Sequence, residues 1–254
     1  MIKNPWFSAP SAATAPRVRL VCLPHAGGGV AIFHPWRKQM PPDVELCAVQ
    51  LPGRDARYQE PLNTDLLDVA GQLADALATA PPARALAIYG HSMGALMAFE
   101  LARALGRRGL RPDLVAVSGR AAPHRMASPA DQLHGLPDAV FIEKLGQRYG
   151  GIPQALLDAP DLLAFFLPIL RADLRAVETY RHVPQAPHDW PLMVYGGMDD
   201  RSVAPADLDE WARHTSGPFR VQTLPGDHFF HQTQAALFVP RLLEDLRRWC
   251  ATGR

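Results

Sequence analysis

A glycine–X–serine–X–glycine pentapeptide, placed between an apolar run and a helical pattern, is the feature that most constrains this chain. Gly90, Ser92 and Gly94 follow the apolar residues 85–89 and precede a helical pattern over residues 95–105. A strand, a sharp turn and a helix in that order raise the serine hydroxyl to the top of a sheet. Roughly one chain of this length in ten would contain the pentapeptide by chance, so an ordinary turn serine is the alternative.

Short apolar segments alternate with amphipathic segments along most of the chain. The segments that predict strands are Val18–Leu23, Leu46–Leu51, Leu86–Tyr89, Leu114–Ser118, Leu192–Tyr195 and Phe219–Leu224. Those that predict the helices between them include Asp65–Ala80, Met93–Arg108, Pro205–His214 and Gln232–Trp249. This alternation predicts an α/β fold with a mostly parallel central sheet flanked by helices.

The alternation is interrupted between residues 121 and 187, where no segment predicts a strand. Helical patterns there cover Pro137–Tyr149, Pro153–Leu157 and Leu162–Arg181. We therefore expect an inserted helical lid over residues 126–184, between two core segments at residues 17–125 and 185–254. A peripheral helical layer is the alternative.

Apolar residues of the insertion lie on one helical face. If the insertion covers a site, we expect Phe141, Phe166 and Leu170 to line a substrate chamber. Most apolar stripes are core, however, so plain core packing is the stronger alternative for each of these residues.

Composition excludes several classes of protein. The 254 residues are 48% hydrophobic, which is enough for one large core, and the formal net charge of +1 implies no nucleic-acid partner. The longest apolar run, Leu162–Leu170, has nine residues and contains Pro168, so it is too short to span a bilayer. We expect no membrane partner.

The three cysteines Cys22, Cys47 and Cys250 lack the spacing of metal ligands. Cys22 and Cys47 lie in apolar runs and predict buried thiols, and the odd, sparse set fits a reducing, cytoplasmic location. Residues 1–16 are rich in Ala, Pro and Ser, and they predict a flexible N-terminal arm rather than a signal peptide.

A nucleophilic serine needs a base and a third group that orients the base. His228 follows the last predicted strand on a loop opened by proline and glycine, which makes it the candidate base. His231, three residues further on, is the alternative. His25 and His91 are expected to be structural or to form pocket walls.

The acid is expected after the penultimate strand, where Asp199 and Asp200 are adjacent. A Gly-x-x-Asp-x-x-Val pattern with Gly197 and Val203 in register favours Asp200 as the catalytic acid. Asp199 would then be a turn residue, although it remains the alternative candidate for the catalytic acid.

Acyl transfer also needs donors for a developing oxyanion. The backbone N–H of Met93, directly after the serine, is one candidate. The glycine-rich loop at residues 23–29 offers the second, which we assign to Ala26. A phosphate-binding loop is disfavoured, because the segment lacks the Gly-Lys-Ser/Thr ending and the dinucleotide spacing. No metal site is indicated.

At this point the motifs resemble those of a known family. They are Leu23-Pro-His-Ala-Gly-Gly, Gln50-Leu-Pro-Gly-Arg-Asp-Ala-Arg, Tyr89-Gly-His-Ser-Met-Gly-Ala, Leu167-Pro-Ile-Leu-Arg-Ala-Asp-Leu with Tyr180, Gly196-Gly-Met-Asp-Asp and Gly226-Asp-His-Phe-Phe. The chain resembles the type II thioesterases, the stand-alone editing hydrolases of polyketide and nonribosomal peptide assembly lines, within the α/β-hydrolase superfamily. Asp227 departs from the family, which more often has glycine there.

The resemblance implies an α/β-hydrolase fold with a flexible helical lid and a Ser92–His228–Asp200 triad. It implies an acyl-thioester substrate on the phosphopantetheine of an acyl or peptidyl carrier protein, a monomeric enzyme, and no cofactor of its own. Carrier proteins are acidic, so four arginines are candidate contacts, with solvated surface charge as the alternative: Arg54, Arg57, Arg120 and Arg125.

Two other functions remain open from the sequence. A small-molecule serine carboxylesterase would keep the same fold and triad, and a non-catalytic module would use the lid to hold an acyl chain. The Leu-Pro-Gly-Arg and lid matches argue against the first, and the intact triad candidates argue against the second.

Overall fold

The computed structural model describes residues 4–8, 16–125, 128–150 and 152–250 of the chain. Its centre is a six-stranded sheet with the strand order β2-β1-β3-β4-β5-β6. Every pair of neighbouring strands in it is parallel. The strands are β1 (Val18–Leu23), β2 (Val44–Ala48), β3 (Ala85–His91), β4 (Leu114–Ser118), β5 (Leu192–Gly197) and β6 (Phe219–Leu224). The predicted α/β class is therefore confirmed.

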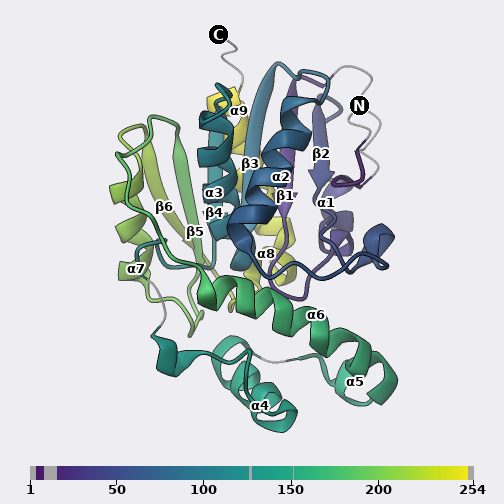
Figure 1. The fold of residues 1–254 in the computed structure, drawn as a ribbon. Coiled ribbons are helices and arrows are strands. Elements are labelled where there is room, and N and C mark those ends of the chain that lie inside the picture. The colour runs from purple at the N-terminus through teal and green to yellow at the C-terminus, as the bar shows by residue number, and fades with distance from the viewer. Residues whose placement is uncertain (1–3, 9–15, 126–127, 151, 251–254) are drawn as a thin grey trace.

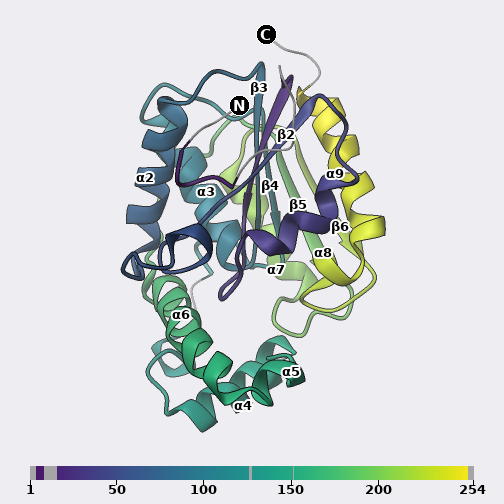
Figure 2. The same cartoon turned by 90° about the vertical axis from the view of Figure 1, so that its right-hand side faces the viewer.

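Helices cover both faces of the sheet (Figures 1 and 2). One face carries α2 (Leu66–Ala78) and α3 (Met93–Gly106), and the other carries α1 (His34–Arg37) and α9 (Ala235–Cys250). The short helices α7 (Pro205–Asp209) and α8 (Phe230–Thr233) follow β5 and β6. Short 3₁₀ helices lie at Val30–Phe33, Asp55–Arg57, Pro129–Asp131 and Glu210–His214.

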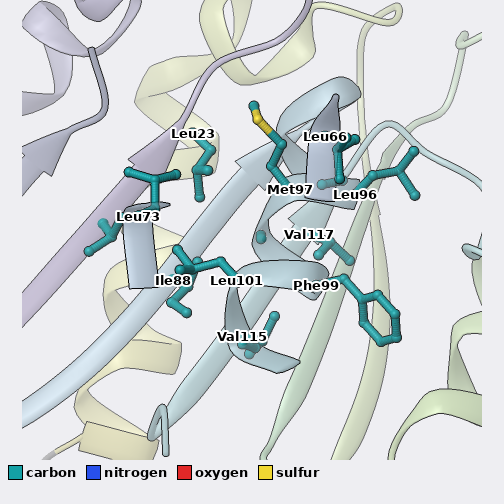
Figure 3. Packing of buried hydrophobic residues seen from close by; sticks show 14 of the residues in the cluster. Leu23, Leu66, Leu73, Ile88, Leu96, Met97, Phe99, Leu101, Val115 and Val117 are labelled. Atoms are coloured by element: carbon teal, nitrogen blue, oxygen red, sulfur yellow. The ribbon is translucent and has the colours of Figure 1, made fainter. Parts of the chain in front are cut away.

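Burial on both faces explains why the inner strands β1, β3, β4 and β5 are nearly continuous apolar runs. Side chains alternate between the faces of a strand. In β1, Val21 and Leu23 pack with α2 and α3, whereas Leu20 and Cys22 pack with α1 and α9. Figure 3 shows the first of these cores, where residues of α3 lie against strand residues such as Ile88. Cys22 and Cys47 are buried free thiols, as expected from their apolar context, and Cys250 is a buried free thiol as well.

The structure differs from the predicted boundaries where the chain leaves the sheet. β2 ends at Ala48 rather than at Leu51, because Val49 forms an isolated antiparallel bridge with Phe7. The helix predicted over residues 232–249 is two helices, α8 and α9, and only the first part of the one predicted over residues 205–214 is α-helical.

The prediction of a flexible arm is wrong for residues 4–8. Trp6 and Phe7 are 7% and 4% exposed and belong to the main core. The Arg57 guanidinium lies 3.8 Å from the centre of the Trp6 ring. Burying two adjacent aromatic side chains stabilises the fold more than leaving them exposed to solvent on an arm would. Residues 1–3 and 9–15 of the predicted arm lie outside the described residues, whereas Pro16 lies within them.

Between β4 and β5 the described residues form three α-helices within the predicted insertion: α4 (Asp138–Tyr149), α5 (Gln154–Leu157) and α6 (Pro160–Thr179). They lie below the sheet in both views (Figures 1 and 2). Residues of α4 and α6 form a small apolar core of their own, which includes Phe141, Leu145 and Leu170. Residues 126, 127 and 151 of the predicted lid lie outside the description. No helix in the described part of the chain is long and apolar enough to cross a membrane.

Candidate functional site

Ser92 occupies a strained turn between β3 and α3. Its φ of 55° and ψ of −110° are unusual for a residue with a side chain. A Cβ on Gly90 would lie 1.9 Å from the Gly94 carbonyl oxygen, and one on Gly94 would lie 2.3 Å from the Leu23 carbonyl oxygen. The turn therefore requires both glycines, and it brings α3 against the end of β1.

A chain of hydrogen bonds runs from Ser92 to an acid. His228 Nε2 lies 3.1 Å from Ser92 Oγ, and His228 Nδ1 lies 2.9 Å from Asp200 Oδ2. The carboxylate accepts from Nδ1–H, which leaves Nε2 free to accept the serine proton. The side chains of His228 and Asp200 are 5% and 2% exposed, so this chain of bonds is shielded from water.

Asp200 is held as an anion by its neighbours. Burial acts to raise its pKa, but the hydrogen bonds from His228 and Ser202 prevail and lower the pKa below its usual value. Ser202 donates to Asp200 Oδ1 from its backbone N–H at 2.8 Å and from its hydroxyl at 2.6 Å. Asp199, the alternative acid, is exposed, and its N–H donates to the Gly226 carbonyl.

Ser202 is a site residue that the sequence analysis missed. Its Oγ also lies 2.9 Å from His228 Nδ1, so it contacts both Asp200 and His228. The signal was present, because a serine two residues after an aspartate is the spacing of an Asx turn.

Three further histidines lie beside His228. His231, the alternative base, is fully buried and stacks on His91 with 3.7 Å between ring centres. The ring of His25 lies 5.7 Å from that of His231. Burial, together with the neighbouring His228 and Arg54, lowers the pKa of His25 to about 3. Burial likewise places the pKa values of His91 and His231 well below the usual range.

A cavity of about 790 Å³ opens beside Ser92. Ala26 and Met93 line it, as do Phe166 and Leu170 from α6. Phe141 was expected in this wall, but it lies fully buried in the core of the insertion, outside the cavity lining within the described residues. Its ring instead packs under the Arg171 guanidinium at 4.2 Å.

A second hollow of about 550 Å³ meets the first at His228 and Tyr149, which line both. Arg148 and Arg201 are the cations at its wall. The Tyr149 ring lies 5.1 Å from the His228 ring, so α4 reaches the site from the lid side. His228 therefore lies where the two hollows join, and Ser92 lies beside it in the larger one.

The two predicted oxyanion donors are backbone groups at the cavity wall. Met93 is the first residue of α3, where a helix has no internal partner for its N–H groups. Ala26 belongs to the loop after β1, and the next N–H in that loop, Gly27, donates to Asp173 Oδ2 at 2.7 Å. Nothing in the described ranges gathers three or more His, Cys, Asp or Glu side chains to hold a metal ion.

The four arginines considered as surface contacts are placed differently. Arg54 and Arg57 are 7% and 8% exposed and are bonded to Asp173 and Glu60. Arg120 lines the cavity beside Ser92. Of the four, Arg125 alone is exposed, and it pairs with Asp207.

We expect the free energy of unfolding to fall as the pH drops below about 6.5. An unfolded histidine takes up a proton near that pH. The rings of His25, His91 and His231 stay neutral in the fold because burial lowers their pKa values. The unfolded chain then binds more protons, so each ring removes about 1.4 kcal/mol of stability per pH unit. Chemical denaturation between about pH 7.5 and 5 measures this slope.

The variant His231→Gln removes one of these rings, and the slope should become shallower. His34→Gln, at an exposed position, is the matched control. An unchanged slope in His231→Gln would contradict the role of the buried cluster.

Comparison with known proteins identifies the family of this chain. The sequence pattern of the thioesterase domain matches residues 18–250. The chain is 40% identical over 230 residues to the thioesterase PikA5 of Streptomyces venezuelae, which covers 90% of this chain and 79% of that protein. It is 38% identical over 237 residues to the linear gramicidin dehydrogenase LgrE of Brevibacillus parabrevis, and this match covers 91% of this chain and 89% of LgrE. The structure of the type II thioesterase BorB, from the borrelidin biosynthetic cluster, superposes with a TM-score of 0.83 at 33% sequence identity. The superposition covers 96% of this chain and 98% of the BorB chain. The chain thus belongs to the thioesterase domain family.

Proposed function

We propose that this protein is an editing thioesterase that hydrolyses aberrant or stalled acyl groups from phosphopantetheinyl carrier proteins. In this proposal Ser92 is the nucleophile, His228 is the base and Asp200 orients the base. The observation that carries it is the hydrogen-bonded chain of these three side chains, of which Ser92 and His228 line a cavity of about 790 Å³.

The reaction follows from the geometry. Ser92 Oγ attacks the thioester carbonyl carbon while His228 Nε2 takes the hydroxyl proton. The backbone N–H groups of Ala26 and Met93 hold the oxyanion that forms. The tetrahedral intermediate then expels the thiol, which takes the proton from His228. A thiol has a pKa of about 8.5, so its expulsion is easier than that of an alkoxide.

Water completes the cycle. His228 deprotonates a water molecule that attacks the acyl–serine ester, and the free acid leaves as the Ser92 hydroxyl regains its proton. Asp200 stabilises the imidazolium formed in both half-reactions. This chemistry asks for no cofactor or metal held by this chain, because the phosphopantetheine arrives with the carrier protein.

The two hollows that meet at His228 suit a substrate of two parts. The larger and more apolar one fits the acyl chain, and the other fits the polar pantetheine arm. The relatives support the same class, since PikA5 is named a thioesterase and BorB a type II thioesterase from a biosynthetic cluster. A cytoplasmic, monomeric enzyme stays a prediction.

Two alternatives are weaker. A small-molecule carboxylesterase would use the same three side chains, and only substrate comparison separates it. A dehydrogenase, the activity in the name of LgrE, is disfavoured, because Ile32 stands where a Gly27-x-Gly29-x-x-Gly dinucleotide motif would need its third glycine.

The decisive experiment measures the release of an acetyl or propionyl group from a phosphopantetheinylated carrier protein. We expect release by the wild type, and a loss of at least about 10³-fold in Ser92→Ala. A wild type that cleaves a simple aryl ester but releases nothing from the carrier would overturn the carrier assignment and favour the carboxylesterase.

The adjacent aspartates give a matched pair of variants for the triad. We expect Asp200→Asn to lower kcat by about 10³- to 10⁴-fold, because an amide no longer stabilises the imidazolium. Asp199→Asn, at an exposed position one residue away, should keep nearly full activity. Asp199 lines the second hollow, so both variants are measured on an aryl ester that lacks the pantetheine arm. Equal losses in the two variants on that ester would contradict the assignment of Asp200.

A further inference from the structure

Two motifs that the triad does not use meet inside the protein. Arg54, from the Leu-Pro-Gly-Arg segment, and Asp173, from α6 of the insertion, lie 119 residues apart in sequence. Two parallel hydrogen bonds of 2.6 Å join the guanidinium to the carboxylate. The Arg54 and Asp173 side chains are 8% and 4% exposed, so the pair is buried. We name it the Arg54–Asp173 clasp.

The clasp also holds the glycine-rich loop after β1. Asp173 Oδ2 accepts the Gly27 N–H at 2.7 Å, and Arg54 Nη1 donates to the Gly28 carbonyl at 3.0 Å. The φ of Gly27 is +76°, and a Cβ there would lie 2.7 Å from Phe166 Cζ. The loop is therefore fixed by polar and apolar contacts from the insertion.

This restraint extends to the Ala26 N–H through a single peptide plane. The His25 carbonyl accepts the Gly28 N–H at 2.9 Å, within the same turn. That carbonyl and the Ala26 N–H belong to one planar trans peptide unit, so they point in opposite directions. Fixing Gly27 and Gly28 thus sets the direction of the Ala26 N–H.

A buried ion pair is a poor source of stability, because desolvation offsets much of its attraction. Its more specific effect here is to fix polar groups in one geometry. We propose that the Arg54–Asp173 clasp positions the Ala26 N–H for the oxyanion, so that α6 takes part in catalysis as well as lining the cavity. This inference rests on the proposed use of Ser92 and Ala26.

The test compares catalysis with the binding of a boronic acid, whose tetrahedral adduct on Ser92 needs the same oxyanion donors. In Asp173→Asn and Arg54→Lys we expect kcat on an aryl ester, per titrated active site, to fall by about 10- to 100-fold. The KM should stay within about threefold, and the boronate inhibition constant should rise in step with the loss in kcat.

Glu45→Gln is the matched control, because it weakens another buried ion pair, Arg19–Glu45, which joins β1 to β2. It should lower the melting temperature and leave kcat and the boronate constant unchanged. A purely structural defect reduces the number of active sites but leaves the boronate inhibition constant of the remaining sites unchanged. An unchanged boronate inhibition constant in both clasp variants would therefore overturn the proposal. The ester assay makes this test independent of any carrier protein.

A different observation carries a second inference. Arg120 follows β4 and lines the cavity, and its carbonyl accepts the Trp211 indole N–H at 2.8 Å, which fixes its backbone. Its Nε is buried without a hydrogen-bond partner among the described residues. No carboxylate in those residues pairs with its guanidinium, whereas Arg54 and Arg103 each bond one.

Arg120 is half-buried, and Glu178 attracts it without forming an ion pair with it. A guanidinium with a buried, unpartnered nitrogen is costly unless a ligand supplies the missing oxygen atoms. Burial lowers the pKa of Arg120 below its usual value, which reflects that cost. The planar guanidinium matches a carboxylate through two parallel hydrogen bonds. The rest of the cavity wall is largely apolar, with Leu145, Leu174 and Val177 among its residues.

We infer that Arg120 is a subsite for a carboxylate carried on the acyl chain, which gives the enzyme a preference for dicarboxylic acyl groups. The test uses N-acetylcysteamine thioesters in matched pairs of four, six and eight carbons: succinyl and butyryl, adipoyl and hexanoyl, suberoyl and octanoyl. The measured quantity is the ratio of kcat/KM within each pair.

In the wild type this ratio should favour the dicarboxylic chain for at least one length. In Arg120→Met it should fall by about 10-fold or more, with partial recovery in Arg120→Lys. Arg125→Met, which removes an exposed arginine paired with Asp207, should leave the ratio unchanged. Equal ratios in the wild type and Arg120→Met at every length would overturn the inference, even if both substrates react more slowly.

Discussion

The close approach of α3 to the end of β1 is the constraint on which the rest of the site depends. With 2.3 Å between a Cβ on Gly94 and the Leu23 carbonyl oxygen, only glycine permits the helix to lie so deep. That depth holds Ser92 at a φ of 55° and places its hydroxyl at the carboxyl edge of the sheet. In a parallel sheet every strand ends at this same edge, so the loops that follow the strands all begin there. One tight contact between helix and strand therefore decides where the loops that carry Asp200 and His228 must meet.

Charge in the interior follows a consistent pattern. Asp200 is stabilised by hydrogen bonds from His228 and Ser202, and the Arg54–Asp173 clasp neutralises itself while it bonds the loop after β1. The neighbouring histidine rings avoid charge instead, because burial lowers their pKa values. Arg120 departs from this pattern at the cavity wall, because no carboxylate of the described residues forms an ion pair with it, and this points to a ligand. The insertion thus contributes an anion on α6 to the loop as well as apolar residues to the cavity.

Much of the fold could be predicted from local patterns. The predicted bounds of β1, β4 and β6 agree with the structure. β1 and β4 are buried apolar runs that end at turn residues, whereas β6 is a partly exposed edge strand that flanking turn residues delimit. The end of β2 and the packing of residues 4–8 could not be predicted, since both depend on the pairing of Phe7 with Val49, far apart in sequence. Phe141 was misplaced for a similar reason. An apolar stripe shows that a residue is buried but does not show which element covers it.

The sequence by itself determined the strand–turn–helix around Ser92 and the order of candidate acid and base along the chain, because both depend on neighbours in the chain. The tertiary structure decided which candidates meet: His228 faces Ser92 while His231 stacks on His91, and Asp200 is buried while Asp199 is exposed. It also joined Arg54 to Asp173. Side chains 119 residues apart leave no local signal of their pairing, because their contact exists only after the sheet and the insertion have packed together.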